Sequence, residues 1–133
     1  MTKKDSLGDL QLAIMRVLWR NGEATVAEAH RALVDERGLA PTTIATMLVK
    51  MERKGVVAHR SEGRRFVYRS IVTEAEVRRS MVGELTERLF AGDTAALVSH
   101  LLSEHESGAA DLEELKRLID EAEARSQTAE DGR

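Results

Sequence analysis

Cysteine is absent from this 133-residue chain, and proline, tryptophan and tyrosine each occur once. Without cysteine the protein can form neither disulfides nor thiolate metal sites. Aromatic residues make up only 3% of the chain, so a core must come from aliphatic residues and methionine. No apolar run approaches the roughly 18 residues that span a bilayer, and no apolar segment of a secretory signal precedes the first amphipathic stretch. We therefore expect a cytoplasmic protein that does not insert directly into a membrane.

Charge is divided unevenly along the chain. Residues 1–71 carry 13 Lys and Arg against 8 Asp and Glu, a net of +5. Residues 72–133 carry 7 Lys and Arg against 15 Asp and Glu, a net of −8. A basic half beside an acidic half is typical of a polyanion-binding module joined to a second part.

Three helices are predicted in the basic half. Apolar residues at helical spacing indicate a first helix over Leu7–Arg20. Thr25, with Glu28 three residues later, forms a capping box that would open a second helix over Val26–Arg37. The only proline suits the first turn of a third helix, predicted over Pro41–Lys54 and ended by a glycine.

Two short strands are predicted after the third helix. β-branched and aromatic residues indicate strands over Val56–Ser61 and Arg65–Ile71. The turn between them contains Gly63, which gives the conformational freedom that a tight hairpin needs. Helices followed by a hairpin with a basic tip are typical of a winged helix-turn-helix. The predicted fold class is therefore mainly α with a small β-hairpin, a winged helix-turn-helix followed by a helical dimerisation region.

The outer face of the third predicted helix is small, hydroxylated and basic. Threonine forms helices poorly, so several threonines on a surface helix indicate that their hydroxyls are used. A hydroxyl and a methyl group suit the edges of bases, whereas cations suit phosphates. We predict base contacts from three threonines and backbone contacts from four basic residues of the helix and the hairpin: Thr42, Thr43, Thr46, Lys50, Arg53, Arg64 and Arg65.

Three amphipathic helices are predicted in the acidic half. The first would begin at Thr73, which forms a second capping box with Glu76, and would end before Ala91-Gly92. A shorter helix would follow from Asp93-Thr94, and a last one would cover Ala109–Ala124. The sequence therefore predicts a DNA-binding domain over 1–71, a dimerisation domain over 72–125 and a disordered tail over 126–133.

About fifty residues in three helices make a poor core of their own, so each apolar stripe needs a partner. A homodimer supplies one and would carry two recognition helices to half-sites about 34 Å apart. The alternative is that the helices fold back onto their own N-terminal domain. The predicted dimer contacts are the apolar residues at helical spacing: Val77, Met81, Leu85, Leu89, Leu97, Leu101, Leu115 and Ile119.

The sequence offers no catalytic or metal-binding constellation. His100 and His105 are five residues apart, so on a helix their rings would point about 140° apart, whereas helical metal ligands are four apart. His30 and His59 have no cluster of ligand residues around them in the sequence. We predict no enzyme activity, no cofactor and no metal.

Three segments carry a resemblance to a known family. They are LGDLQLAIMRVLW, ATVAEAHRALVDERGLAPTTIATMLVKMERKGVV and GRRFVYRS. Together they closely resemble the BlaI/MecI/CopY family, the penicillinase-repressor type of bacterial transcriptional regulator. The resemblance is strong over residues 7 to about 71 and looser to about residue 122, through LFAGDTAALVSHLL and LEELKRLIDE.

The resemblance implies a homodimeric repressor on palindromic operator DNA, with the three threonines in the major groove and Lys50 at the backbone. In the β-lactam branch, a membrane sensor protease relieves repression by cutting the repressor in its C-terminal helices. The similar segment LVSHLL would place that bond at His100-Leu101, where that branch joins Asn and Phe. In the copper branch, cysteine pairs bind metal, and this chain has none.

The residues thus leave two hypotheses from different classes. The first is a homodimeric winged-helix repressor that binds a palindromic operator. The alternative is a winged-helix protein-interaction module whose basic face binds DNA only unspecifically. Inverted repeats in the DNA upstream of the gene would distinguish the two.

Overall fold

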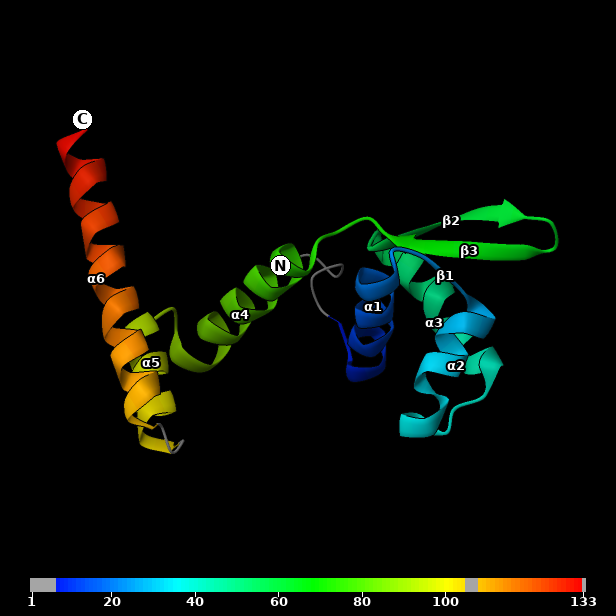
Figure 1. Cartoon of the computed structure of the whole chain (residues 1–133), viewed down its shortest axis with the longest axis horizontal. Coiled ribbons are helices and arrows are strands. Elements are labelled where there is room, and N and C mark those ends of the chain that lie inside the picture. The colour runs from blue at the N-terminus through cyan, green and yellow to red at the C-terminus, as the bar shows by residue number, and fades with distance from the viewer. Residues whose placement is uncertain (1–6, 105–107, 133) are drawn as a thin grey trace. The chain divides into compact units, whose positions relative to one another are not determined.

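The computed structural model describes residues 7–104 and 108–132, which divide into two compact units (Figure 1). The first unit ends at Leu89 and the second begins at Phe90. The elements are α1 (Asp9–Asn21), β1 (Ala24–Thr25), α2 (Val26–Arg37), α3 (Pro41–Lys54), β2 (Val57–Glu62), β3 (Arg65–Ser70), α4 (Glu74–Phe90), α5 (Thr94–Glu104) and α6 (Ala109–Asp131). Over the described ranges, every helix is too short or too polar to span a bilayer.

Local hydrogen bonds set the starts of α2 and α4, as the capping boxes predict. The Glu28 backbone N–H donates to Thr25 Oγ1 at 3.1 Å, and the Thr25 N–H donates to the Glu28 carboxylate at 2.9 Å. This backbone bond, followed by the Thr25 hydroxyl, holds the pKa of Glu28 below its usual range. The Glu76 N–H donates to Thr73 Oγ1 at 3.0 Å. Both helices therefore begin within one residue of the predicted position.

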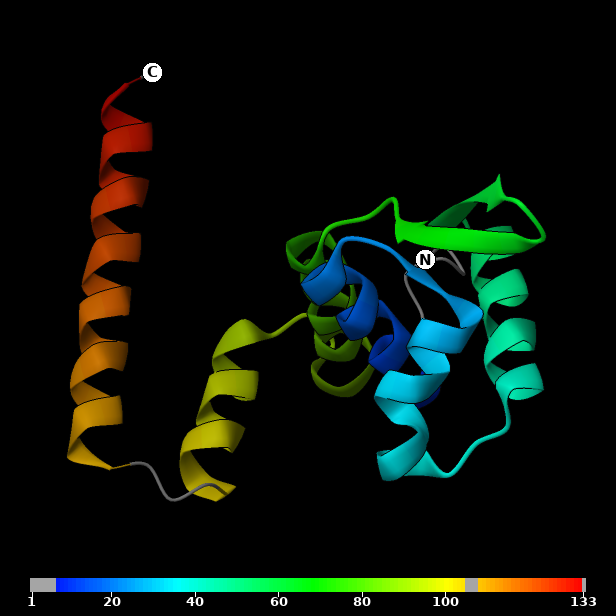
Figure 2. The ribbon, with the colours of Figure 1, turned by 45° about the vertical axis from the view of Figure 1, so that its right-hand side comes forward.

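The core of the first unit lies among α1, α2, α3 and the sheet, with the β2–β3 hairpin across one end of the helices (Figure 2). The largest side chains with almost no exposure come from α1, α3, the residue before β2 and the first residue of β2: Ile14, Met15, Val17, Leu18, Ile44, Leu48, Met51, Val56 and Val57. Aliphatic side chains and methionine thus supply the packing, as the scarcity of aromatic residues requires. Each large apolar side chain buried in this way contributes roughly 1.5–3 kcal/mol.

The sheet contains three antiparallel strands in the order β1-β3-β2. β2 and β3 pair from Val57 with Ser70 to Glu62 with Arg65, so the turn has two residues. Gly63 has a φ of +65°, the sign that the first central position of a type II′ turn requires. β1 pairs with Val67 and Tyr68 and was not predicted, because two residues are too few to show alternation.

The helix α4 belongs to the first unit. Val77 is 5% exposed within the core of that unit, and Met81 packs against it. The change of charge near residue 72 therefore precedes the division between the compact units, which follows Leu89. The reason is apolar packing, because this first helix of the acidic half has one side that the core buries. Ala91 and Gly92, with φ of +50° and +82°, end α4.

The last helix is longer than the sequence predicts. α6 runs to Asp131 instead of ending near Ala124, so the structure describes residues 126–131, where the sequence predicts a disordered tail, as helical. Alanine, glutamate and glutamine form helices well, and a polar composition does not prevent a helix whose apolar stripe begins further upstream. The Thr128 hydroxyl also donates to the Ala124 carbonyl at 2.9 Å.

Candidate nucleic-acid interface

One side of helix α3 packs into the core, and the opposite side is exposed to solvent. Its buried side carries Ile44, Leu48 and Met51. The predicted contact residues lie on the outer side, where Thr43 is half-buried and four others are exposed: Thr42, Thr46, Lys50 and Arg53. A repeat of 3.6 residues per turn produces this division from the sequence alone.

The Thr46 side chain has one hydrogen bond within the helix. Its hydroxyl donates to the Thr42 backbone carbonyl at 2.9 Å. The hydroxyl proton is used by that carbonyl, but the lone pairs of the hydroxyl oxygen can still accept a hydrogen bond without any change in the helix. Adenine and cytosine both present an amino donor in the major groove.

The basic residues of the hairpin lie in two environments. Arg64 is exposed at the second position of the turn. Arg65 instead forms an ion pair with Glu62 at 3.1 Å, and Glu62 also pairs with Arg60 at 2.9 Å. The hydrogen bond from Arg65, and then that from Arg60, lowers the pKa of the Glu62 carboxyl. Water and salt screen such exposed pairs, so Arg65 can exchange a carboxylate for a phosphate.

Two further contacts connect the hairpin and α3 to other parts of the first unit. Arg60 pairs with Glu23 at 2.5 Å, and its hydrogen bond lowers the pKa of that carboxyl. Lys54, at the end of α3, donates to the Gln11 side chain of α1 at 2.7 Å. These two cations therefore tie the hairpin and α3 to the rest of the unit, although the sequence presents them as part of a basic run.

Sequence reasoning missed a cluster between α3 and the hairpin. His59 Nδ1 lies 2.5 Å from the Glu52 carboxylate, and the His59 ring stacks on Phe66 with centroids 4.2 Å apart. Tyr68 lies at a ring distance of 5.4 Å from His59, and its burial, followed by the Glu52 charge, raises its pKa. The strand register could have predicted this cluster, because a two-residue turn places residues 59, 66 and 68 on one face of the hairpin.

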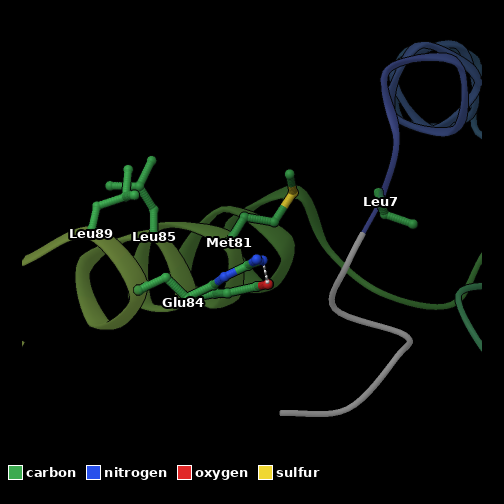
Figure 3. Close-up of a pocket in the computed structure, with 6 residues that line it drawn as sticks. Leu7, Met81, Glu84, Leu85 and Leu89 are labelled. Carbon is green, nitrogen blue, oxygen red and sulfur yellow. Dashed lines mark hydrogen bonds and ion pairs between the residues drawn. The ribbon is translucent and has the colours of Figure 1, made fainter. Parts of the chain in front are cut away.

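The predicted dimer contacts of α4 differ in exposure. Val77 lies in the core of its own unit, which leaves it little surface for a second chain. Figure 3 shows Met81, Leu85 and Leu89 on the same side of α4, and the two leucines are 41% and 71% exposed. Leu7 lies at the edge of the same shallow pocket. The available apolar face of α4 is therefore its C-terminal half.

The second unit also exposes apolar side chains. Leu97 and Leu115 are half-buried, whereas Leu101 and Ile119 are 45% and 53% exposed. A shallow apolar pocket joins α5 to α6, with Val98 and Leu102 on one helix and Ile119 on the other. His100 is exposed and its ring lies 5.9 Å from that of Phe90, while His105 falls outside the residues that the structure describes.

An exposed hydroxyl-bearing helix beside a basic two-stranded wing, on a three-helix core, defines a winged-helix DNA-binding protein. The chain belongs to the penicillinase repressor family, whose model matches residues 7–121. The predicted family resemblance is thereby confirmed. The relatives of this chain are transcriptional repressors and not enzymes.

Individual relatives agree with the family over nearly the whole chain. The penicillinase repressor of Bacillus licheniformis is 26% identical over 91% of this chain and 94% of its own length. The transcriptional regulator BlaI of Mycobacterium tuberculosis is 33% identical over 93% and 90%. The solution structure of the DNA-binding domain of the repressor BlaI matches with a TM-score of 0.51 and 33% identity, over 57% of this chain and 93% of that domain. The predicted winged-helix fold is confirmed.

Proposed function

We propose that this protein represses transcription by binding palindromic operator DNA as a homodimer. The observation that carries the proposal is the outer face of α3, where exposed threonines and cations lie opposite the core and beside the basic wing. The threonines would read base edges, and Arg64 and Arg65 would hold the sugar–phosphate backbone. A repressor of this kind acts in the cytoplasm, where the bacterial chromosome lies.

A mobility-shift titration tests this function directly. We expect the protein to prefer the DNA upstream of its own gene over random DNA of equal length by about a thousandfold or more at physiological salt. The preference should map to an inverted repeat. Equal, salt-labile binding to both DNAs would refute the proposal and would favour the protein-interaction module.

The two groups of contact residues should behave differently when they are truncated. Arg64→Ala should weaken operator and random DNA about equally and reduce the slope of log affinity against log salt by about one, because a phosphate contact is lost. Thr46→Ala should mainly reduce discrimination, by about 1–3 kcal/mol at one base pair. Titrations on both DNAs at four salt concentrations measure both effects. The reverse pattern would refute the assigned roles.

The homodimer would be built by the exposed leucines of α4 and the second unit. Leu85, Leu89 and Leu101 are each more than 40% exposed. Covering such side chains with a second copy would stabilise the assembly by roughly 25 cal/mol for each Å² of apolar surface removed from water. Symmetric dimers are also the commonest assembly and match the two-fold symmetry of a palindrome.

Release would follow cleavage at His100-Leu101 by a membrane sensor protease. No side chain of α5 is fully buried, so opening the helix around this bond would disrupt only partly buried apolar contacts. Cleavage there would detach Leu101 and all of α6 from the DNA-binding unit. Intact-mass measurement on protein from cells treated with a β-lactam should detect a fragment that ends at His100. Full-length protein alone, under conditions that relieve repression, would rule this mechanism out.

A further inference from the structure

A cleft between α3 and the wing adjoins the proposed DNA-contact surface. Val49 and Arg53 of α3 and Phe66 of β3 line it, together with the cluster of Glu52, His59 and Tyr68. Val49 is 44% exposed and Phe66 is 47% exposed. Two large apolar side chains from different elements thus meet at one solvent-exposed place. Exposed apolar surface that is shared between elements in this way is typical of a binding surface.

Two aromatic neighbours on the hairpin hold the Phe66 ring, and α3 holds one of them. The ring stacks on His59 at an interplanar angle of 29°, and Tyr68 meets it edge-on with centroids 6.5 Å apart. His59 is in turn held by the Glu52 carboxylate of α3 at 2.5 Å. Cross-strand aromatic contacts of this kind stabilise a hairpin and restrict the ring to one orientation. The wing ring is therefore placed at a set position relative to the outer face of α3.

The cleft continues the outer face of α3. Thr42, Thr46, Val49 and Arg53 follow one another at intervals of three or four residues, so they lie along one side of the helix. A duplex bound against the threonines would therefore pass the cleft as well. This continuity distinguishes DNA from an unrelated protein as the occupant.

The chemistry of the cleft matches one nucleotide of a DNA strand. The strand alternates an anionic phosphate with a deoxyribose whose edge is largely hydrocarbon. The cleft likewise places the Arg53 cation next to the apolar walls of Val49 and Phe66. The nearby Glu52 carboxylate, which would repel a phosphate, is directed to His59. We propose that Val49 and Phe66 pack against the deoxyribose of the nucleotide whose phosphate Arg53 binds.

This inference rests on the proposed operator binding and adds two contact residues to it. A sugar contact carries no sequence information and releases no counterion. It therefore strengthens binding to all duplexes alike and leaves the salt dependence unchanged. Arg53, as the phosphate partner, should change the salt dependence.

Titration of Phe66→Ala and Val49→Thr against operator and random DNA tests the cleft. We expect each variant to bind both DNAs roughly tenfold more weakly, from the apolar area lost, with the same salt slope as the parent protein. Phe66→Leu should recover most of the affinity. Arg53→Ala should instead lower the salt slope by about one. Ile71→Thr is the matched control, because Ile71 is 50% exposed outside the cleft and should bind as the parent does.

Thermal unfolding separates this effect from misfolding. Phe66 and Val49 are both about half exposed, so both variants should stay folded, and Phe66→Ala should lower the melting temperature by only a few degrees through its lost ring contacts. Parent-like DNA affinity of both variants, while Arg64→Ala is weakened, would overturn the sugar cleft and leave operator binding intact. A deficit that vanishes on DNA with uracil in place of thymine would also overturn it, in favour of a contact with the thymine methyl. Failure of the parent protein to prefer its operator would instead refute the proposed function.

Discussion

Leu89→Asp should convert the protein from a dimer to a monomer and weaken its binding to a two-half-site operator by about 100-fold or more. Leu89 is 71% exposed and lies on the same side of α4 as Leu85. If this face packs against a second copy, the substitution buries a carboxylate without a partner, which costs several kcal/mol. Once the two DNA-binding units are no longer linked, the second half-site is bound without the benefit of a high effective concentration.

Sedimentation equilibrium and titrations on one and two half-sites measure this loss. The affinity for a single half-site should be unchanged, because Leu89 is exposed, lies outside the core of its unit and belongs to neither α3 nor the wing. Gly83→Asp is the matched control: it adds the same charge to α4, about 120° around the helix from Leu89, where a new Cβ meets no atom within 4 Å. A variant that stays dimeric would exclude this face of α4 from the interface.

The sequence predicted the helix starts and turns that depend on interactions between residues a few positions apart. Thr25 and Glu28 lie within one helical turn, and Gly63 sits within its own hairpin, so the helix starts and the turn were predictable to within one or two residues. β1 was missed because a two-residue strand shows no alternation and forms only by pairing with Val67 and Tyr68, more than forty residues further along. The extent of the first unit depends likewise on Val77 reaching the core.

Part of the candidate DNA-contact site could be predicted from the sequence, and part could not. The outer face of α3 follows from helical periodicity, and the structure places Thr46 and Lys50 there. The partners of charged groups do not follow from periodicity. That Arg65 pairs with Glu62, or that His59 joins Glu52 to a wing aromatic, depends on the register of the hairpin and its packing on α3. Charge counts show how many cations a segment has, whereas the fold decides which of them already have a partner.

Leu48→Ala should lower the free energy of unfolding by about 2–5 kcal/mol. Leu48 is 1% exposed on the core side of α3, so its truncation leaves a cavity among side chains that cannot all move to fill it. Small domains have only about 5–15 kcal/mol of stability, so a loss of this size is a large share of the total. For a unit of this size it should lower the melting temperature by about 10 °C or more.

Val49→Ala is the matched control, because Val49 is the next residue in the chain but is 44% exposed on the opposite side of α3. Its truncation should leave the stability unchanged or slightly raised, since alanine is the better helix former. At a temperature where both variants are folded, Leu48→Ala should bind operator within about twofold of the parent protein, because truncation on the core side leaves the outer-face side chains in place. Denaturant unfolding and operator titration measure the two properties separately. A loss of DNA affinity in folded Leu48→Ala, without a loss of stability, would contradict the division of α3 into a packing side and a contact side.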